Sequence, residues 1–212
     1  AREYGAYVLG GDTSESSDLV ISCSAFGVAT KRRLMLRSGA KPGDIVAVTG
    51  SFGKSAAGLR TLLGQMSPPT RLRKKLVDSV LMPKARLDEG LILAQTGAVT
   101  ASIDSSDGLA WSLHEIARAS SVGIELDDLP ISNEAAEYAR LSSVDPVDLA
   151  LCGGEEFELV VCLKKNSATR ALNAVKALRG SGGGTADAGI VGLSPQGRRT
   201  RGRPDVWEHW AW

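Results

Sequence analysis

Three short apolar runs, separated by segments with helical periodicity, most strongly constrain how this chain can fold. They occupy residues 44–49, 99–103 and 157–163. Runs of this length and composition are typical of buried strands. Elsewhere, apolar residues recur at intervals of three and four, which predicts helices. The alternation indicates an α/β or α+β fold, with a mixed sheet covered by helices.

The same patterns predict the remaining elements and one domain boundary. We place the boundary in the basic, turn-rich stretch that follows residue 30, which divides the chain into residues 1–30 and 31–212. The expected helices cover residues 54–63, 71–81, 87–95 and 134–141. Two more are expected from apolar residues at helical spacing. One is marked by Leu109, Leu113, Ile116 and Ala117, and the other, capped near Ser167, by Ala168, Leu172, Val175 and Leu178. Further strands are expected at residues 5–12, 19–28, 122–126 and 190–193.

Composition argues against several functional classes. With 25 basic and 24 acidic side chains among 212 residues, the formal net charge of +1 gives no electrostatic argument for binding nucleic acid or a membrane surface. No apolar run approaches the ~20 residues that span a bilayer, and the amino end has no secretory signal pattern. The three cysteines lie far apart in apolar stretches, which is typical of a reduced intracellular protein. We therefore expect a soluble, cytoplasmic protein.

Two acidic motifs follow predicted strands. In Gly10-Gly11-Asp12-Thr13, two glycines allow close approach of a ligand and the carboxylate offers an oxygen to Mg²⁺. Asp104-Ser105-Ser106-Asp107 precedes a helix, whose amino end favours anions, so the carboxylate pair suits a metal-bridged phosphate. The alternatives are a turn with a capping aspartate for the first motif and an N-capped helix for the second.

Two glycine-containing segments are also candidates for a site. Cys152-Gly-Gly-Glu-Glu-Phe-Glu158 presents acids at a strand start, either as site carboxylates or as an ordinary solvated loop. Gly50-Ser-Phe-Gly-Lys-Ser55 is similar to a phosphate-binding P-loop, but that motif needs a glycine five residues before its second one. Val48 occupies this position, so we reject a P-loop here.

The carboxyl end is rich in tryptophan, with three of the four tryptophans in the last six residues. Indole rings either pack on a domain or stack on a flat ligand, and both interpretations remain open. The cluster Arg198, Arg199, Arg201 and Arg203 just before this tail is interpreted as solvated. His114 lies in a predicted amphipathic helix, and two histidines without Cys/His spacing do not predict a zinc site.

In combination and in order, these motifs resemble those of the thiamine-monophosphate kinase family. This family shares its fold with aminoimidazole ribonucleotide synthetase, selenophosphate synthetase and a hydrogenase maturation factor. The matching segments are Gly10–Thr13, residues 36–44, 48–59, 83–86, 103–109, 123–130 and 151–159, and Val206-Trp-Glu-His-Trp210 near the end. The match runs over nearly the whole chain.

The resemblance implies Mg²⁺-dependent transfer of the ATP γ-phosphate to thiamine monophosphate. Carried over by position, the metal ligands are Asp12, Asp104 and Asp107, the nucleotide contacts are Gly11, Asp12, Arg37 and Ser106, and the substrate contacts are Glu155 and Trp207. Transfer would be direct, with no covalent protein intermediate and no catalytic residue beyond positioning and charge neutralisation. The resemblance also implies the C-terminal domain of the aminoimidazole ribonucleotide synthetase-like fold and, for a complete member, a homodimer.

The sequence departs from the family at several positions. Lys54 stands where Asp is frequent, Glu156 replaces the second acid, and Phe157, Val206 and Trp207 replace commoner residues. Family members carry a further N-terminal segment with more metal-binding aspartates. Residues 1–30 would then be the end of an N-terminal ATP- and metal-binding domain, and this chain alone an incomplete part. The alternatives are another ATP-dependent enzyme of the superfamily and a nucleotide-binding fragment without turnover.

Overall fold

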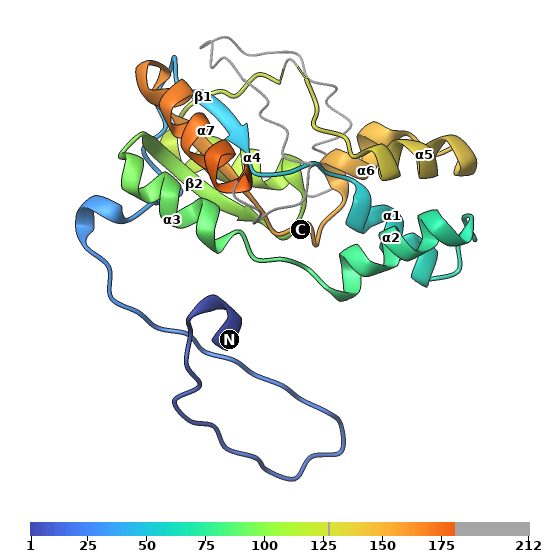
Figure 1. The fold of residues 1–212 in the computed structure, drawn as a ribbon. Helices are drawn as coiled ribbons and strands as arrows, with labels where there is room; N and C mark the ends of the chain where they lie inside the picture. Colours follow the sequence, from blue (N-terminus) through green and yellow to red (C-terminus); the bar gives the residue numbers. More distant parts are fainter. Residues whose placement is uncertain (127, 181–212) are drawn as a thin grey trace. The chain divides into compact units, whose positions relative to one another are not determined.

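The structure, a computed structural model, describes residues 1–126 and 128–180 (Figure 1). The chain divides into two units, Ala1–Leu34 and Met35–Trp212. No helix in the described ranges is long and apolar enough to cross a membrane.

The larger unit is built on a three-stranded antiparallel sheet. Its strands are β1 (Ile45–Val48), β2 (Val99–Ser105) and β3 (Glu158–Leu163), in the order β1-β3-β2. β3 is therefore the central strand: β2 pairs with it from Glu158 to Leu163, and β1 pairs with its last four residues, Val160 to Leu163. The expected α+β class is confirmed, and the three apolar runs form these three strands. The ladders among the described strands are antiparallel, however, and not the mixed sheet that was expected.

Helices cover both faces of the sheet (Figure 1). α4 (Leu109–Ser120) packs on one face, and α3 (Leu87–Thr96) and α7 (Lys165–Gly180) pack on the other. Alternate residues of each strand point to opposite faces, so both faces must be apolar. On the α4 face the buried strand residues are Val46, Val48, Ala101, Ile103, Val160 and Cys162, and on the other face they are Ala47, Val161 and Leu163.

The remaining helices form a second cluster with a core of its own. It contains α1 (Lys54–Leu62), α2 (Thr70–Leu81), α5 (Asn133–Ser142) and α6 (Pro146–Cys152). Its fully buried residues include Leu76, Tyr138 and Leu149. α1 and α2 approach closely at Gly58, where an added Cβ would overlap the backbone oxygen of Leu76.

Most predicted helices form within one or two residues of their expected bounds, and the exceptions have local causes. α7 begins at Lys165, so the cap predicted near Ser167 is wrong and Ser167 lies in the first turn. Residues 122–126 do not form the predicted strand. Their alternating apolar residues Val122, Ile124 and Leu126 pack against the α4 face of the core without joining the sheet. The predicted strand at 190–193 lies outside the described residues.

α6 is a helix that the sequence patterns did not predict. Asp145 caps it by accepting a hydrogen bond of 2.8 Å from the backbone N–H of Val147, and proline opens its first turn. An acidic cap followed by proline is an ordinary helix-start signal, which could have identified this helix.

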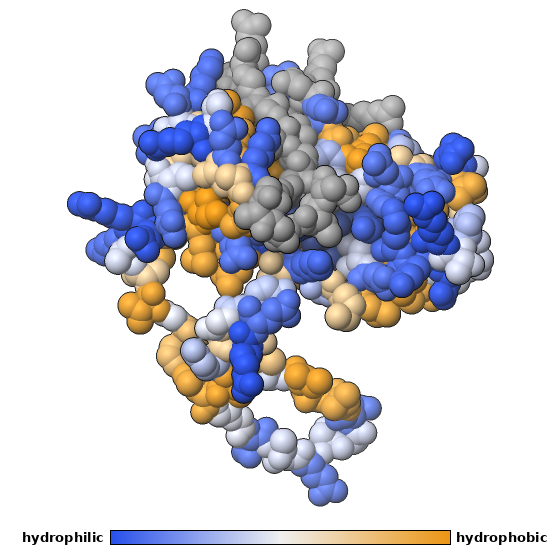
Figure 2. All heavy atoms as spheres, in the orientation of Figure 1, coloured by the Kyte–Doolittle hydropathy of each residue, from blue (hydrophilic) through white to orange (hydrophobic). Residues whose placement is uncertain are grey.

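The smaller unit, Ala1–Leu34, contains two 3₁₀ turns, Arg2–Tyr4 and Lys31–Arg33. The strands predicted at residues 5–12 and 19–28 are wrong for this structure, because neither segment forms a ladder with another described segment. An isolated strand leaves its backbone groups unpaired and is not stable. The apolar residues of this segment are exposed (Figure 2), among them Tyr7, Val8, Leu19, Val20, Ile21 and Phe26.

We predict that the close approach of α1 and α2 makes Gly58→Ala destabilising. Alanine favours a helix over glycine by about 1 kcal/mol, but forcing a methyl group against a packed backbone costs about 1–3 kcal/mol. Gly90→Ala in α3 is the matched control, since its Cβ would meet only the Leu159 side chain, at 3.3 Å. Urea unfolding should rank Gly58→Ala below the wild type and Gly90→Ala at or above it. The reverse order would contradict the packing described here.

Candidate functional site

Two exposed carboxylates lie where β2 gives way to α4. Asp104 is the penultimate residue of β2, and Asp107 lies in the short connection that ends at Gly108. Neither side chain hydrogen-bonds or ion-pairs with other residues that the structure describes. Gly108 has φ 105°, and an added Cβ would lie 2.9 Å from the backbone oxygen of Leu151. This connection therefore needs glycine, and it presents two unneutralised acids to solvent.

The segment that leads into β3 packs against this connection. The N–H of Glu155 donates to the carbonyl of Ser106 at 2.8 Å, and that of Phe157 donates to the carbonyl of Ser105 at 2.9 Å. Gly154 allows the approach, since an added Cβ would lie 2.5 Å from the Ser106 oxygen. The structure thus brings together Ser106 and Glu155, two of the residues expected in the site from separate motifs.

The backbone of this segment is strained on both sides of Glu156. Glu155 has φ 66° and Phe157 has φ 53°, both in the left-handed region that side chains other than glycine rarely adopt. Each such residue costs on the order of 1–3 kcal/mol and persists only where its surroundings hold it.

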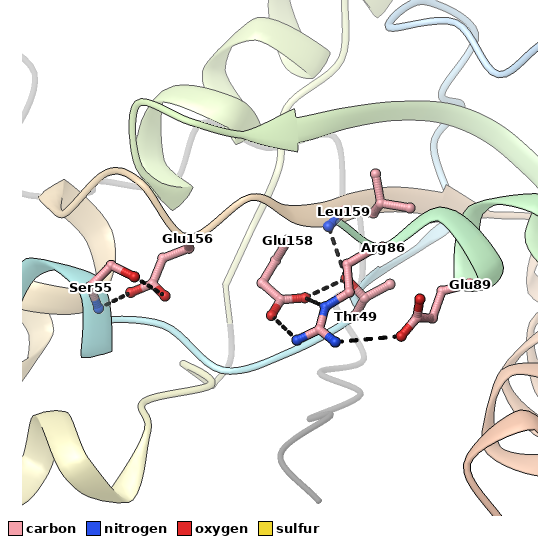
Figure 3. Close-up of polar contacts among 7 residues, drawn as sticks. All are labelled: Thr49, Ser55, Arg86, Glu89, Glu156, Glu158 and Leu159. Carbon is pink, nitrogen blue, oxygen red and sulfur yellow. Dashed lines mark hydrogen bonds and ion pairs between the residues drawn. The ribbon is translucent and has the colours of Figure 1, made fainter. Parts of the chain in front are cut away.

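Glu156, between the two strained residues, caps the amino end of α1 (Figure 3). Its Oε1 accepts from the backbone N–H of Ser55 and its Oε2 from the Ser55 hydroxyl, both at 3.1 Å. The helix cap position itself is Gly53, which has no side chain to do this. Burial raises the pKa of Glu156 to about 7, with a further increase from the charge of Glu158, while the hydrogen bonds from Ser55 and Gly53 act in the opposite direction.

This cap gives a physical reason for rejecting a P-loop at residues 50–55. A helix amino end binds phosphate through free N–H groups. Here the Glu156 carboxylate accepts from the Ser55 N–H. A bound anion would have to displace a carboxylate of the chain itself.

Glu158 anchors the same segment to the start of α3 (Figure 3). The guanidinium of Arg86 donates from Nε to Oε2 at 2.7 Å and from Nη2 to Oε1 at 2.5 Å, and the Thr49 hydroxyl donates to Oε2 at 2.6 Å. Burial of the guanidinium opposes its charge, but the hydrogen bonds and charges of Glu158 and Glu89 together outweigh this and raise the pKa of Arg86 above its usual value. Gly50 lies against the carboxylate, and any Cβ there would overlap it.

The sequence motifs do not predict these anchoring pairs. Arg86 and Glu156 lie in segments that match the family, but the motifs do not indicate that Ser55 and Arg86 bind the acids. A signal was present for Glu158, because an acid that begins a buried strand requires a cation or several donors. Nothing in the linear sequence specifies that the cation comes from residue 86.

Arg37 lies in the loop before β1 and is exposed. Its Nη1 is 3.9 Å from Glu115 on α4, whose carboxylate also binds Arg118 at 2.9 Å. The hydroxyl of Ser120 holds the loop by accepting from the N–H groups of Gly39 and Ala40, at 3.2 and 3.1 Å. The loop is thus fixed while the guanidinium stays accessible.

The other predicted site residues lie in the smaller unit or outside the described residues. Gly11 and Asp12 lie in the unit Ala1–Leu34, where Asp12 Oδ1 accepts a hydrogen bond of 2.8 Å from the N–H of Thr13. Trp207 and the tryptophan tail lie outside the described residues. Within those residues no group of three or more His, Cys, Asp or Glu side chains could hold a metal ion. The ligand assignments of Asp12, Asp104 and Asp107 therefore remain predictions.

Comparison with known proteins places the chain in a family. Residues 41–185 match the family described as AIR synthase related protein, C-terminal domain. The chain belongs to this family. The match includes the sheet, the β2–α4 connection and the segment leading into β3, so the site described above lies on the family's domain.

Thiamine-monophosphate kinases are among the curated relatives of this family member. The protein from Pyrococcus horikoshii is 41% identical over 170 residues, which cover 79% of this chain and 51% of the relative. The one from Halobacterium salinarum is 35% identical over 210 residues, which cover 97% of this chain and 66% of the relative. The solved structure of AaThiL complexed with AMPPCP and TMP is 28% identical, with a TM-score of 0.61, and the match covers 79% of this chain and 52% of that chain. The chain spans about half the length of the first curated relatives it matches.

The raised pKa of Glu156 predicts a pH-dependent stability. Between pH 4.5, the ordinary value for a glutamate, and about 7, the folded state binds more protons than the unfolded state. The free energy of unfolding should therefore fall as the pH rises through this range, by on the order of 3 kcal/mol, and change little above it. Glu156→Gln cannot ionise and should lose this decrease. Urea unfolding of both proteins at pH 5 and pH 8 measures it, and equal decreases would assign the effect to other groups.

The Arg86–Glu158 pair predicts a large penalty for removing one partner. Arg86→Met should destabilise by about 3–5 kcal/mol, because it leaves a buried carboxylate without its cation. The double variant with Glu158→Gln should lose less than the sum of the two single variants. Lys75→Met is the control, since it breaks an ion pair with Glu134 in which the lysine side chain is 50% exposed. Glu134 is itself buried, but its lysine partner is half exposed, so the cost should be smaller than that of Arg86→Met. An additive double-mutant cycle for Arg86 and Glu158 would contradict a coupled pair.

Proposed function

We propose that this protein acts as a thiamine-monophosphate kinase, which transfers the γ-phosphate of ATP to thiamine monophosphate and yields thiamine diphosphate and ADP. Support comes from the relative in Pyrococcus horikoshii, 41% identical over most of this chain, and from the likeness to AaThiL complexed with AMPPCP and TMP. We expect the reaction in the cytoplasm, and a homodimer for the complete kinase.

The structural observation that carries the proposal is the β2–α4 connection with Asp104 and Asp107. Both side chains are exposed, and no described cation neutralises them. Carboxylate oxygens suit Mg²⁺, which binds through one or two carboxylates and completes its shell with phosphate oxygens and water. The donor set therefore fits the metal. Asp104 and Asp107 would hold it, with Asp12 as the third ligand, and the bound metal would neutralise charge on the phosphates.

The remaining assignments agree with the chemistry of each side chain. The Arg37 side chain is 60% exposed, and its contact with Glu115 is long, at 3.9 Å. Its guanidinium therefore remains available to bind phosphate oxygens of ATP. Gly11 and Ser106 would complete the nucleotide site. Glu155 would pair with or accept from the cationic heterocycle of the substrate, and Trp207 would stack on it.

This arrangement favours positioning over covalent chemistry. In the described site, the segment that carries Glu155 is held to the β2–α4 connection by backbone hydrogen bonds. Transfer between two phosphates needs in-line placement and charge neutralisation, which fixed connections supply. The chain would thus act by holding Glu155 and the Asp104–Asp107 connection in one geometry.

Asp107→Asn provides the direct test. The variant should lower kcat/KM for Mg-ATP by at least about 100-fold, because it removes a charged metal ligand. Its unfolding midpoint should not change, since the side chain is exposed. Thiamine diphosphate formation is measured with the 212-residue chain and, where the natural gene encodes more residues, with the complete gene product. Asp88→Asn, an exposed acid on α3, is the control and should retain full activity.

Three outcomes would contradict this assignment. Turnover of Asp107→Asn close to that of the wild type would remove Asp107 from the metal site. Consumption of ATP with selenide or formylglycinamidine ribonucleotide, but not with thiamine monophosphate, would assign the protein to another activity of the superfamily. Binding of Mg-ATP without any product would indicate a nucleotide-binding fragment.

A further inference from the structure

Two carboxylates that the proposed reaction does not use hold the segment leading into β3. Glu156 and Glu158 flank Phe157 and reach different elements, as Figure 3 shows: Glu156 reaches Ser55 at the start of α1, and Glu158 reaches Arg86 ahead of α3. The segment is therefore fixed at two points only two residues apart.

The side chain just before these anchors has no anchor of its own. Glu155 is exposed, and its carboxylate makes no hydrogen bond or ion pair with the residues that the structure describes. Its direction is therefore set by its backbone. That backbone has φ 66°, which glutamate does not adopt unless its surroundings impose it.

We propose that Glu156 is a positioning residue. By holding its carboxylate on α1, it keeps the strained backbone of Glu155 and Phe157 in place and so directs Glu155 beside Ser106. The Glu155 and Phe157 N–H groups then donate to the β2–α4 connection, at 2.8 and 2.9 Å. The part of this inference that concerns substrate rests on the function proposed above.

The geometry singles out Glu156 rather than Glu158 for this role. Glu156 lies directly between the two residues with positive φ, so release of its carboxylate frees both. Glu158 already belongs to β3, where it pairs with Ser105 in the ladder. Gly53, the cap position of α1, cannot easily supply a substitute cap, because an added Cβ would lie 2.9 Å from Ala135 Cβ. The rival role for Glu156 is a helix cap alone, and the two roles predict different results.

Amide hydrogen exchange distinguishes these roles without any ligand. In Glu156→Ala, the Glu155 and Phe157 amides should exchange at least about tenfold faster, because the hydrogen bonds they make lose their support. The Val160 and Val161 amides of β3 should change less than about twofold. Ser55→Ala removes one of the two hydrogen bonds to Glu156, so it should also speed exchange of the Glu155 and Phe157 amides, but by a smaller factor. If Glu156→Ala does not fold, Ser55→Ala provides the same comparison. Glu156→Asp, which keeps a carboxylate, should fall between alanine and wild type.

Ser132→Ala is the matched control. Ser132 caps α5 by accepting from the N–H of Ala135 at 3.0 Å, and in the described part of the chain it does not hydrogen-bond to residues 152–158. It should leave the Glu155 and Phe157 amides protected. Unchanged protection of these amides in Glu156→Ala would overturn the proposal. Equal acceleration in β3 would also overturn it, since that result assigns Glu156 to overall stability.

Ligand titration then tests the consequence for substrate. With Mg²⁺ and AMPPCP present, Glu156→Ala should weaken binding of thiamine monophosphate about tenfold and binding of AMPPCP less than about twofold, with partial recovery in Glu156→Asp. Equal weakening of both ligands would contradict a role directed at Glu155. If the wild-type protein does not bind thiamine monophosphate, the proposed function fails, while the exchange experiment still decides whether Glu156 positions the segment.

Discussion

The antiparallel pairing of β2 with β3 is the constraint on which the site depends. It places the end of β2 beside the beginning of β3, although 50 or more residues separate them in the chain, with Ser105 opposite Glu158 and Asp104 opposite Leu159. The pairing continues past the sheet through the hydrogen bonds that Phe157 and Glu155 donate. Without this register the acids of the two motifs would belong to unrelated loops. With it, both the exposed and the buried acids gather at one end of the sheet.

The acids at this end of the sheet fall into two groups, one exposed and one at least partly buried, and the two groups have different roles in the site. Asp104, Asp107 and Glu155 are exposed and unpaired among the described residues, so they are available to a ligand. Glu158 is buried and Glu156 partly buried, and each is satisfied by fixed donors: a guanidinium and a hydroxyl for Glu158, a helix amino end and a hydroxyl for Glu156. Burying a carboxylate is costly unless donors compensate it. Such fixed donors also hold the backbone on either side of the exposed Glu155.

Local patterns predicted much of this fold, and non-local contacts account for most of what they missed. The three strands and most helices follow from periodicity, because the spacing of apolar residues along the chain depends directly on whether one face or both faces of an element are buried. Residues 122–126 show where such prediction stops. Their alternating apolar residues correctly predict that one side of the segment is buried, but this pattern also fits an irregular segment that packs against the core without joining a sheet. At the site, the motifs identified Ser106 and Glu155 but not their contact, and they identified Glu156 without its partner Ser55. These partners are far apart in the sequence and meet only in the folded structure, so no short stretch of sequence can identify them.

The left-handed backbone at Glu155 and Phe157 places stability and site geometry in opposition. Glycine at either position would adopt the same φ without steric penalty, and asparagine would do so more easily than phenylalanine. A laboratory selection for heat resistance alone would therefore favour replacing both residues, and it would discard the Glu155 carboxylate whether or not the protein uses it. The residues recovered from such a selection, with and without a concurrent demand for activity, would thus measure how much folding stability this protein gives up to keep one acid in one direction.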